Sequence, residues 1–178
     1  VALREAKVCC KREVHSIGGR GLLQAIGLSK RFGAGAKGTL AVDNVSFTVR
    51  PGEVFGLLSE NGAGKTTTLR MLATVLRPTA GTAKVMGHDI IAQPHLVRRQ
   101  IGVVAADTGV YDRLTPFEIV RYFGRLSDLD ETTIRRRTYE IFERLDMTRF
   151  ADQRAWQLSK GTKQKVNIAR ALIHDPPV

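Results

Sequence analysis

The sequence contains few cysteines, few histidines and no long apolar run. Its two cysteines, Cys9 and Cys10, are adjacent, and neither they nor the four histidines have the spacing of metal ligands. No segment approaches the ~18 apolar residues of a membrane helix, and the N-terminal segment lacks the apolar core of a signal peptide. These absences exclude a disulfide-stapled framework and a membrane span, and they favour a soluble, cytosolic protein.

The composition is that of a folded protein with an excess of basic residues. With 43% hydrophobic and 25% charged residues among 178, the chain can bury a core, and one domain is expected. The formal net charge is +11, and +5 of it lies in residues 1–31. Exposed aromatic residues are not interleaved with these charges as they are in nucleic-acid grooves. We therefore expect residues 1–21 to form a basic, disordered tail.

Hydrophobic patterning predicts an α/β fold. Alternating apolar and polar residues indicate half-buried strands at 22–33 and 40–49, and mostly apolar segments indicate buried strands at 50–59 and 101–106. Another short strand is expected at 81–90, with a short helix at 94–100. The sequence therefore predicts a sheet that is interrupted by helices.

Helical spacing dominates the rest of the chain. A helix is expected from Lys65 to before Pro78, with an apolar face formed by Leu69, Leu72, Ala73 and Leu76. Residues 115–150 read as a helical insertion whose apolar face contains Ile134, Ile141, Phe142 and Leu145, with an arginine run at 135–137 on its exposed side. A last helix buries Val166, Ala169 and Ile173 and stops at Pro176 and Pro177.

The segment "SENGAGKTT" between the predicted strand and helix has the features of a phosphate-binding loop. Glycines at 62 and 64 let successive backbone N–H groups point inward, and the following helix N-terminus adds a favourable dipole. Lys65 can reach β- and γ-phosphate oxygens, and the Thr66 hydroxyl can ligate Mg²⁺. The order of strand, turn and helix makes this motif much more specific than a bare pattern match.

Ser59 is the one departure from the pattern G-x-x-x-x-G-K-[ST], which has glycine at that position. If the loop requires a positive φ there, serine costs about 1 kcal/mol. The departure leaves Lys65, Thr66 and the backbone donors in place.

A second glycine pattern, residues 33–38, matches G-x-G-x-x-G but leads into a predicted strand. Because a dinucleotide fingerprint must open a helix, this pattern predicts a mobile surface loop and argues against NAD binding. GTP is disfavoured as well, since the sequence contains no N-K-x-D and no D-x-x-G motif.

From residue 22 onward the chain resembles the ATP-binding subunits of ABC transporters. The resemblance is carried by "SKRFG", "AVDNVSFTVRPGEVFGLLSENGAGKTTTLRML", "YDRLT" and "LSKGTKQKVNIARALIHDPPV". Within the family, these sequence segments are most similar to those of the sodium-extruding, NatA-type exporter ATPases. The resemblance implies a P-loop NTPase core with an N-terminal antiparallel β-subdomain and a helical subdomain at about 108–157.

The resemblance also implies roles for particular residues. Phe32 corresponds to the aromatic residue that stacks on adenine, although a core phenylalanine is the alternative. The signature loop, which contacts ATP held by a second subunit, corresponds to Leu158, Ser159, Lys160, Gly161 and Thr162. Nucleotide binding is assigned to nine consecutive residues: Ser59, Glu60, Asn61, Gly62, Ala63, Gly64, Lys65, Thr66 and Thr67.

One family position is filled by an unexpected residue. The family places a glutamine that contacts Mg²⁺ where this sequence has Ala106, with Asp107 beside it. Either Asp107 substitutes as an oxygen ligand for Mg²⁺ or the contact is absent.

The acidic residues needed for hydrolysis do not occur in the sequence. Hydrolysis needs an acidic residue to hold Mg²⁺ and a base to position water. The resemblance implies that both lie in an apolar strand that ends in paired acids, and the sequence contains no run of four apolar residues followed by paired acids. In the family this strand follows the position of Val178. The expectation is therefore a C-terminally truncated ATPase domain, residues 22–178, that binds ATP without hydrolysing it, is poorly stable and has exposed sheet edges.

The resemblance implies ATP and Mg²⁺ as cofactors and two kinds of partner. Integral-membrane permease subunits would hold the protein at the inner face of the cell membrane, and a second ATPase subunit would close over ATP. The implied function is export across the cytoplasmic membrane, with Na⁺ as the candidate solute. Two alternatives remain: a soluble ABC ATPase of DNA repair or translation, and a non-catalytic nucleotide-binding module.

Overall fold

The computed structural model describes residues 22–33, 38–105 and 109–178. The chain divides into two compact units, Val1–Ile101 with Val178, and Gly102–Pro177. In the described part of the chain, no helix has the length and apolar character needed to cross a bilayer.

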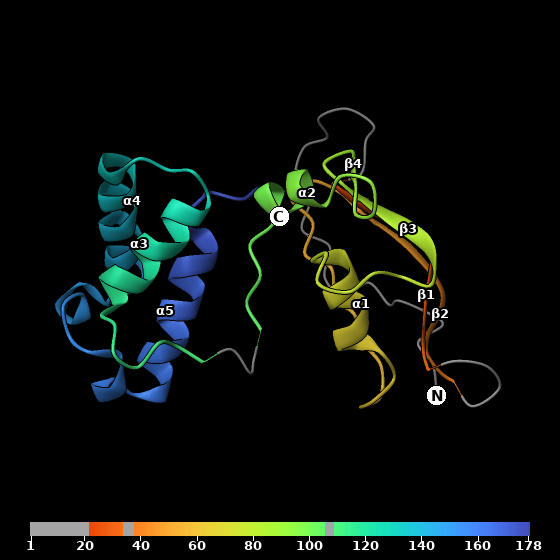
Figure 1. Cartoon of the computed structure of the whole chain (residues 1–178), viewed down its shortest axis with the longest axis horizontal. Helices are drawn as coiled ribbons and strands as arrows, with labels where there is room; N and C mark the ends of the chain where they lie inside the picture. The colour runs from red at the N-terminus through yellow and green to blue at the C-terminus, as the bar shows by residue number, and fades with distance from the viewer. Residues whose placement is uncertain (1–21, 34–37, 106–108) are drawn as a thin grey trace. The chain divides into compact units, whose positions relative to one another are not determined.

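A four-stranded antiparallel sheet is the core of the first unit (Figure 1). Its order is β2-β1-β3-β4, and its strands are β1 (Leu23–Phe32), β2 (Thr39–Val49), β3 (Ala80–Val85) and β4 (His88–Asp89). Leu23 lies opposite both Val49 and Val85, and such inward residues form one apolar face. The strands predicted at 22–33, 40–49 and 81–90 are therefore confirmed.

Two helices complete this unit, α1 (Lys65–Leu72) and α2 (Pro94–Gln100). The α2 helix is formed as predicted, whereas α1 is shorter than expected. It ends because Thr74 adopts a left-handed conformation with φ of 59°. Leu69, predicted to be buried, is 57% exposed, whereas Leu72 is buried as predicted, together with Thr68 and Met71.

The two buried strands predicted at 50–59 and 101–106 are wrong for the described residues. Residues 53–60 and 101–105 have no regular secondary structure, and Val54, Leu58 and Val103 are more than half exposed. An apolar run becomes a buried strand only when neighbouring strands satisfy its backbone. The described residues provide no such neighbour for either segment.

The second unit is helical, as its sequence predicts. It contains α3 (Pro116–Leu126), α4 (Glu131–Arg144), two 3-10 turns at Thr148–Phe150 and Ala155–Gln157, and α5 (Lys160–Leu172). Side-chain caps begin all three helices: Thr115 with Glu118 in a capping box, Asp130, and Ser159.

The three helices pack around one apolar core (Figure 1). Ile134 and Phe142 of α4 are fully buried, while Ile141 and Leu145 are partly buried. Val166, Ala169 and Ile173 are also fully buried, so the face predicted for the last helix is confirmed. Of the three arginines predicted to be exposed, the one at 137 is partly buried, because its guanidinium donates to the Ile173 carbonyl oxygen.

Asp89 joins β3, β4 and the turn that leads to α2. Its carboxylate accepts hydrogen bonds from the Thr82 hydroxyl at 2.8 Å and from the Ile91 and Ala92 N–H groups at 2.8 and 2.9 Å. Burial acts to raise the pKa of this carboxyl, but the three hydrogen bonds outweigh burial and hold the pKa below its usual value.

We expect Asp89→Ala to lower the free energy of unfolding at pH 7 by about 1–3 kcal/mol, because two N–H groups and a hydroxyl lose their acceptor. The folded-state pKa is depressed, so this stabilisation is complete above about pH 3.9 and is lost as the pH falls through the folded value. Urea denaturation of both proteins between pH 7 and pH 2.5 measures the difference. Asp152→Ala, which removes an exposed carboxylate, is the control, and an equal loss in both variants would contradict this role for Asp89.

Candidate nucleotide-binding site

The glycine-rich turn lies directly before α1 and leads into its first residue. The N–H of Ala63 donates to the Glu60 carbonyl oxygen at 3.3 Å, and Gly62 and Gly64 have φ angles of 81° and 102°. Both angles belong to the left-handed region that favours glycine. The turn thus has the conformation that the sequence pattern predicts.

Gly64 fixes this turn against the sheet. A Cβ atom on Gly64 would lie 2.2 Å from the Ala41 carbonyl oxygen of β2, which is far inside van der Waals contact. A Cβ on Gly62 would meet nothing within 4 Å. Gly64 is therefore required for a close backbone approach, whereas Gly62 leaves open space above the loop.

Backbone donors gather at the start of α1. Within the described residues, no backbone acceptor is recorded for the N–H groups of Gly62, Gly64, Lys65, Thr66 and Thr67. No acidic side chain occupies the first turn of the helix. Unpaired N–H groups at a helix N-terminus attract anions, so this loop offers several neighbouring donors that suit phosphate.

The Lys65 side chain lies over the loop. Its Nζ donates to the carbonyl oxygens of Ser59 at 2.6 Å and Glu60 at 2.7 Å, and to the Ser59 hydroxyl at 3.2 Å. These partners are uncharged oxygens, and the described chain has no ion pair at Lys65. The ammonium charge is therefore solvated but not neutralised.

Ser59 carries no backbone strain. It is not among the non-glycine residues of the described chain that have a positive φ. The condition for the expected cost of about 1 kcal/mol is not met, because the turn places its left-handed residues at Gly62 and Gly64 instead. Sequence reasoning missed the contact that Ser59 does make, its hydrogen bond with Lys65.

The donor set for a metal ion is small. Thr66 is exposed in the first turn of α1, and its hydroxyl is compatible with one position in a Mg²⁺ shell completed by phosphate and water. No cluster of three or more metal-ligating side chains occurs in the ranges that the structure describes. Ala106 and Asp107 lie outside the described residues.

Phe32 ends β1 and is 45% exposed, so it is not a core phenylalanine. The Lys30 ammonium lies 5.5 Å from the centre of its ring, within cation–π range. The ring therefore offers an exposed face at the edge of the same unit that carries the glycine-rich turn.

The predicted signature loop is mostly helical. Leu158 is buried at 7% exposure, Ser159 is the N-cap of α5, and Lys160, Gly161 and Thr162 form the first helical turn. The Ser159 hydroxyl accepts from the Thr162 N–H at 3.2 Å. The sequence predicted an anion site beside a helix N-terminus, and the structure places all five residues at such an end.

One contact of this segment could not be predicted from sequence. The Lys163 ammonium lies 2.9 Å from an Asp112 carboxylate oxygen, and the Trp156 N–H donates to the Asp112 carbonyl oxygen at 3.1 Å. These bonds join residues far apart in the sequence, by 51 positions for Lys163 and Asp112, and no local pattern signals them. They tie the start of α5 to the turn that precedes α3.

Comparison with known proteins identifies the family. A family model described as ABC transporter matches residues 42–178, which is most of the chain. The chain belongs to the ABC transporter family. The matched region is the ATP-binding domain, which confirms the resemblance inferred from the motifs.

Two relatives and one solved structure show the extent of the similarity. The ATP-binding protein NatA of Bacillus subtilis (strain 168) is 47% identical over 84% of this chain and 61% of its own length. The doxorubicin resistance ATP-binding protein DrrA of Mycobacterium tuberculosis (strain CDC 1551 / Oshkosh) is 39% identical over 85% and 45%. An ATP-binding cassette solved as a dimer in a post-hydrolysis state with ADP and Pi is 25% identical, with a TM-score of 0.74 over 86% of this chain and 70% of that one.

The structural likeness confirms the α/β, P-loop NTPase fold class of this ABC domain. The chain spans 61% of the length of NatA and 45% of the length of DrrA.

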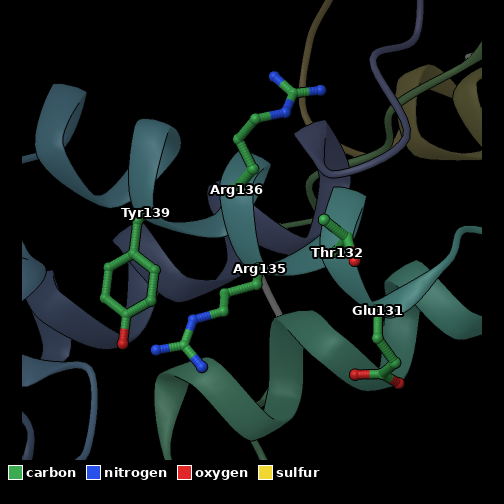
Figure 2. Close-up of a pocket in the computed structure, with 5 residues that line it drawn as sticks. All are labelled: Glu131, Thr132, Arg135, Arg136 and Tyr139. Carbon is green, nitrogen blue, oxygen red and sulfur yellow. The ribbon is translucent and has the colours of Figure 1, made fainter.

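A hollow on α4 of the ABC domain lies among residues that no motif singles out (Figure 2). It is lined by Glu131, Thr132, Arg135, Arg136 and Tyr139, and Arg136 extends away from Glu131 and Arg135. Hydrogen bonds from two arginines of α3, at 121 and 125, lower the pKa of Glu131. The Glu131 carboxylate is thus already paired, and we assign this hollow no ligand.

We expect Gly64→Ala to destabilise the protein by at least about 3 kcal/mol, because the new methyl group would overlap a backbone carbonyl that cannot rotate away. Gly62→Ala is the matched control and should cost only about 1 kcal/mol, since its strain is conformational and its space is open. Chemical denaturation of the two variants beside the unmodified protein measures both values. Equal costs at the two positions would contradict the close approach of Gly64 to β2.

Proposed function

We propose that this protein is the ATP-binding subunit of an ABC exporter. The observation that carries the proposal is the loop before α1, where the Lys65 ammonium lies beside backbone N–H groups that have no backbone acceptor and a Cβ on Gly62 would meet no atom within 4 Å. Phosphate is the anion that best matches such a site, because it accepts several N–H donors at once and neutralises the lysine.

The same residues can hold the rest of the nucleotide. In this proposal Glu60, Asn61 and Ala63 shape the cradle between Ser59 and Gly64. The Thr66 hydroxyl would ligate Mg²⁺ that is bound to the phosphates, with Asp107 as a second candidate ligand. The exposed face of Phe32 would stack on adenine.

A second ATPase subunit completes the proposed site. The start of α5, with Ser159, Lys160 and Gly161, is a second set of helix N-terminal donors and would contact the nucleotide of the partner subunit. The similar cassette solved as a dimer with ADP and Pi supports this arrangement.

Binding and hydrolysis are separate in this proposal. The sequence contains no apolar run followed by paired acids, which are the groups that hold Mg²⁺ and position water. We propose that these 178 residues bind ATP but do not hydrolyse it by themselves, and that the ATPase activity belongs to the full-length parent protein.

The proposed work is export at the inner face of the cell membrane, through integral-membrane permease subunits. We propose Na⁺ as the solute, because the motifs are most similar to the NatA type and identity to NatA exceeds that to DrrA. A soluble ABC ATPase of DNA repair or translation would share the phosphate-binding loop and the signature loop. Salt-sensitive binding of DNA or RNA would favour that alternative.

Lys65→Ala should weaken Mg-ATP binding at least about tenfold, because a charged donor to the phosphates is lost. Lys84→Ala, which removes an exposed lysine of the same unit, should bind like the unmodified protein. Titration calorimetry with ATP and Mg²⁺ measures the affinities, and thermal melting confirms that both variants fold. Equal affinity in Lys65→Ala would refute the assigned site.

The solute can be tested in everted membrane vesicles from cells that produce the parent protein with its permease. ATP should drive uptake of radioactive sodium, and Lys65→Ala in the parent should abolish it, because nucleotide binding is lost. ATP-driven uptake of another solute without sodium uptake would contradict Na⁺ and retain the exporter.

A further inference from the structure

We propose that the Ser59 hydroxyl positions Lys65 in the nucleotide-free loop and thereby weakens nucleotide binding. This inference rests on the proposed function, because it assumes that Lys65 binds phosphate. It assigns a role to the one residue of the loop that departs from the phosphate-loop pattern.

The loop already occupies every N–H donor of the Lys65 ammonium. An ammonium group has three N–H donors, and the loop itself supplies three acceptors within 3.2 Å of Nζ. A phosphate oxygen can bond to Lys65 only after one of these acceptors is released.

The three acceptors of Lys65 differ in the strength of their hydrogen bonds. The carbonyl contacts, at 2.6 and 2.7 Å, are short, whereas the Ser59 hydroxyl accepts at 3.2 Å and is the weakest of the three. All three acceptors are uncharged, so an anionic phosphate oxygen competes favourably with any of them. The hydroxyl is therefore the contact that a phosphate displaces.

The proton of the Ser59 hydroxyl is directed away from Lys65. Ser59 Oγ donates to the Glu60 carbonyl oxygen at 3.3 Å, so its proton points to the backbone and its lone pair points to Lys65. In this geometry the side chain occupies a donor of Lys65 without offering a donor to phosphate. Removing the hydroxyl frees one N–H donor of Lys65 and takes no hydrogen-bond donor away from the nucleotide.

The backbone allows a clean test. Because Ser59 lacks a positive φ, alanine fits this position without conformational strain. The variant Ser59→Ala removes the hydroxyl and keeps Cβ. Ser59→Thr keeps the hydroxyl, and Ser59→Gly restores the residue that the pattern prefers.

The experiment is titration calorimetry of the protein with ATP and Mg²⁺, combined with thermal melting of the nucleotide-free forms. We expect Ser59→Ala to bind Mg-ATP about three- to tenfold more tightly, and Ser59→Thr to bind within about twofold of the unmodified protein. The nucleotide-free Ser59→Ala protein should melt no higher than the unmodified protein, because it has lost a hydrogen bond. Ser59→Gly should also bind more tightly.

Tighter binding by a variant of equal or lower thermal stability separates a positioning role from a purely structural one. A structural role predicts that Ser59→Ala weakens ATP binding along with the fold. Unchanged or weaker binding by Ser59→Ala overturns the inference, and so does tighter binding by Ser59→Thr.

The two levels of the proposal fail in different ways. If Lys65→Ala binds Mg-ATP as tightly as the unmodified protein, or the unmodified protein binds none, the proposed function is wrong and this inference falls with it. If Lys65→Ala loses affinity and Ser59→Ala gains none, only the role of Ser59 is wrong.

Discussion

The approach of Gly64 to the Ala41 carbonyl oxygen is the constraint on which the candidate site depends. It sets the start of α1 against β2 at a distance that no side chain would permit. This contact holds the start of α1 in place, and with it the first-turn N–H groups and the backbone that carries Lys65. A rigid helix N-terminus favours anion binding, because donors that are already in place need no further ordering when an anion binds.

In the nucleotide-free loop, the Lys65 ammonium is bound by oxygen atoms of the loop itself. Lys65 bonds to oxygens of Ser59 and Glu60, so its charge is solvated without being neutralised. Neutral acceptors hold the lysine near the place where phosphate would bind, and they compete with phosphate less strongly than a carboxylate would. We therefore propose the loop, rather than the hollow on α4, as the phosphate site (Figure 2).

The parts of the fold that were predictable from sequence are those set by local patterns. Alternation predicted β1 and β2, and helical spacing predicted the helices of the second unit, to which the structure adds side-chain caps at Thr115, Asp130 and Ser159. The phosphate loop was predictable because its residues are consecutive. The buried strands predicted at 50–59 and 101–106 are wrong for their described residues, since a buried strand depends on distant partners that local composition does not reveal.

The remaining features of the site depend on contacts that are distant in sequence or on side-chain direction. The ion pair between Lys163 and Asp112 and the overlap that excludes a Cβ at Gly64 could be seen only in three dimensions. The same holds for Ser59, where a pattern mismatch suggested strain and the structure shows a hydrogen bond.

A crystal structure of the protein with a non-hydrolysable ATP analogue and Mg²⁺ would test the central claim most directly. The account predicts phosphate oxygens within hydrogen-bond distance of Lys65 Nζ and of the N–H groups at Gly64 and Thr66, with Nζ withdrawn from the Ser59 hydroxyl. An analogue bound elsewhere, or one whose phosphates leave all three Lys65 contacts intact, would contradict it.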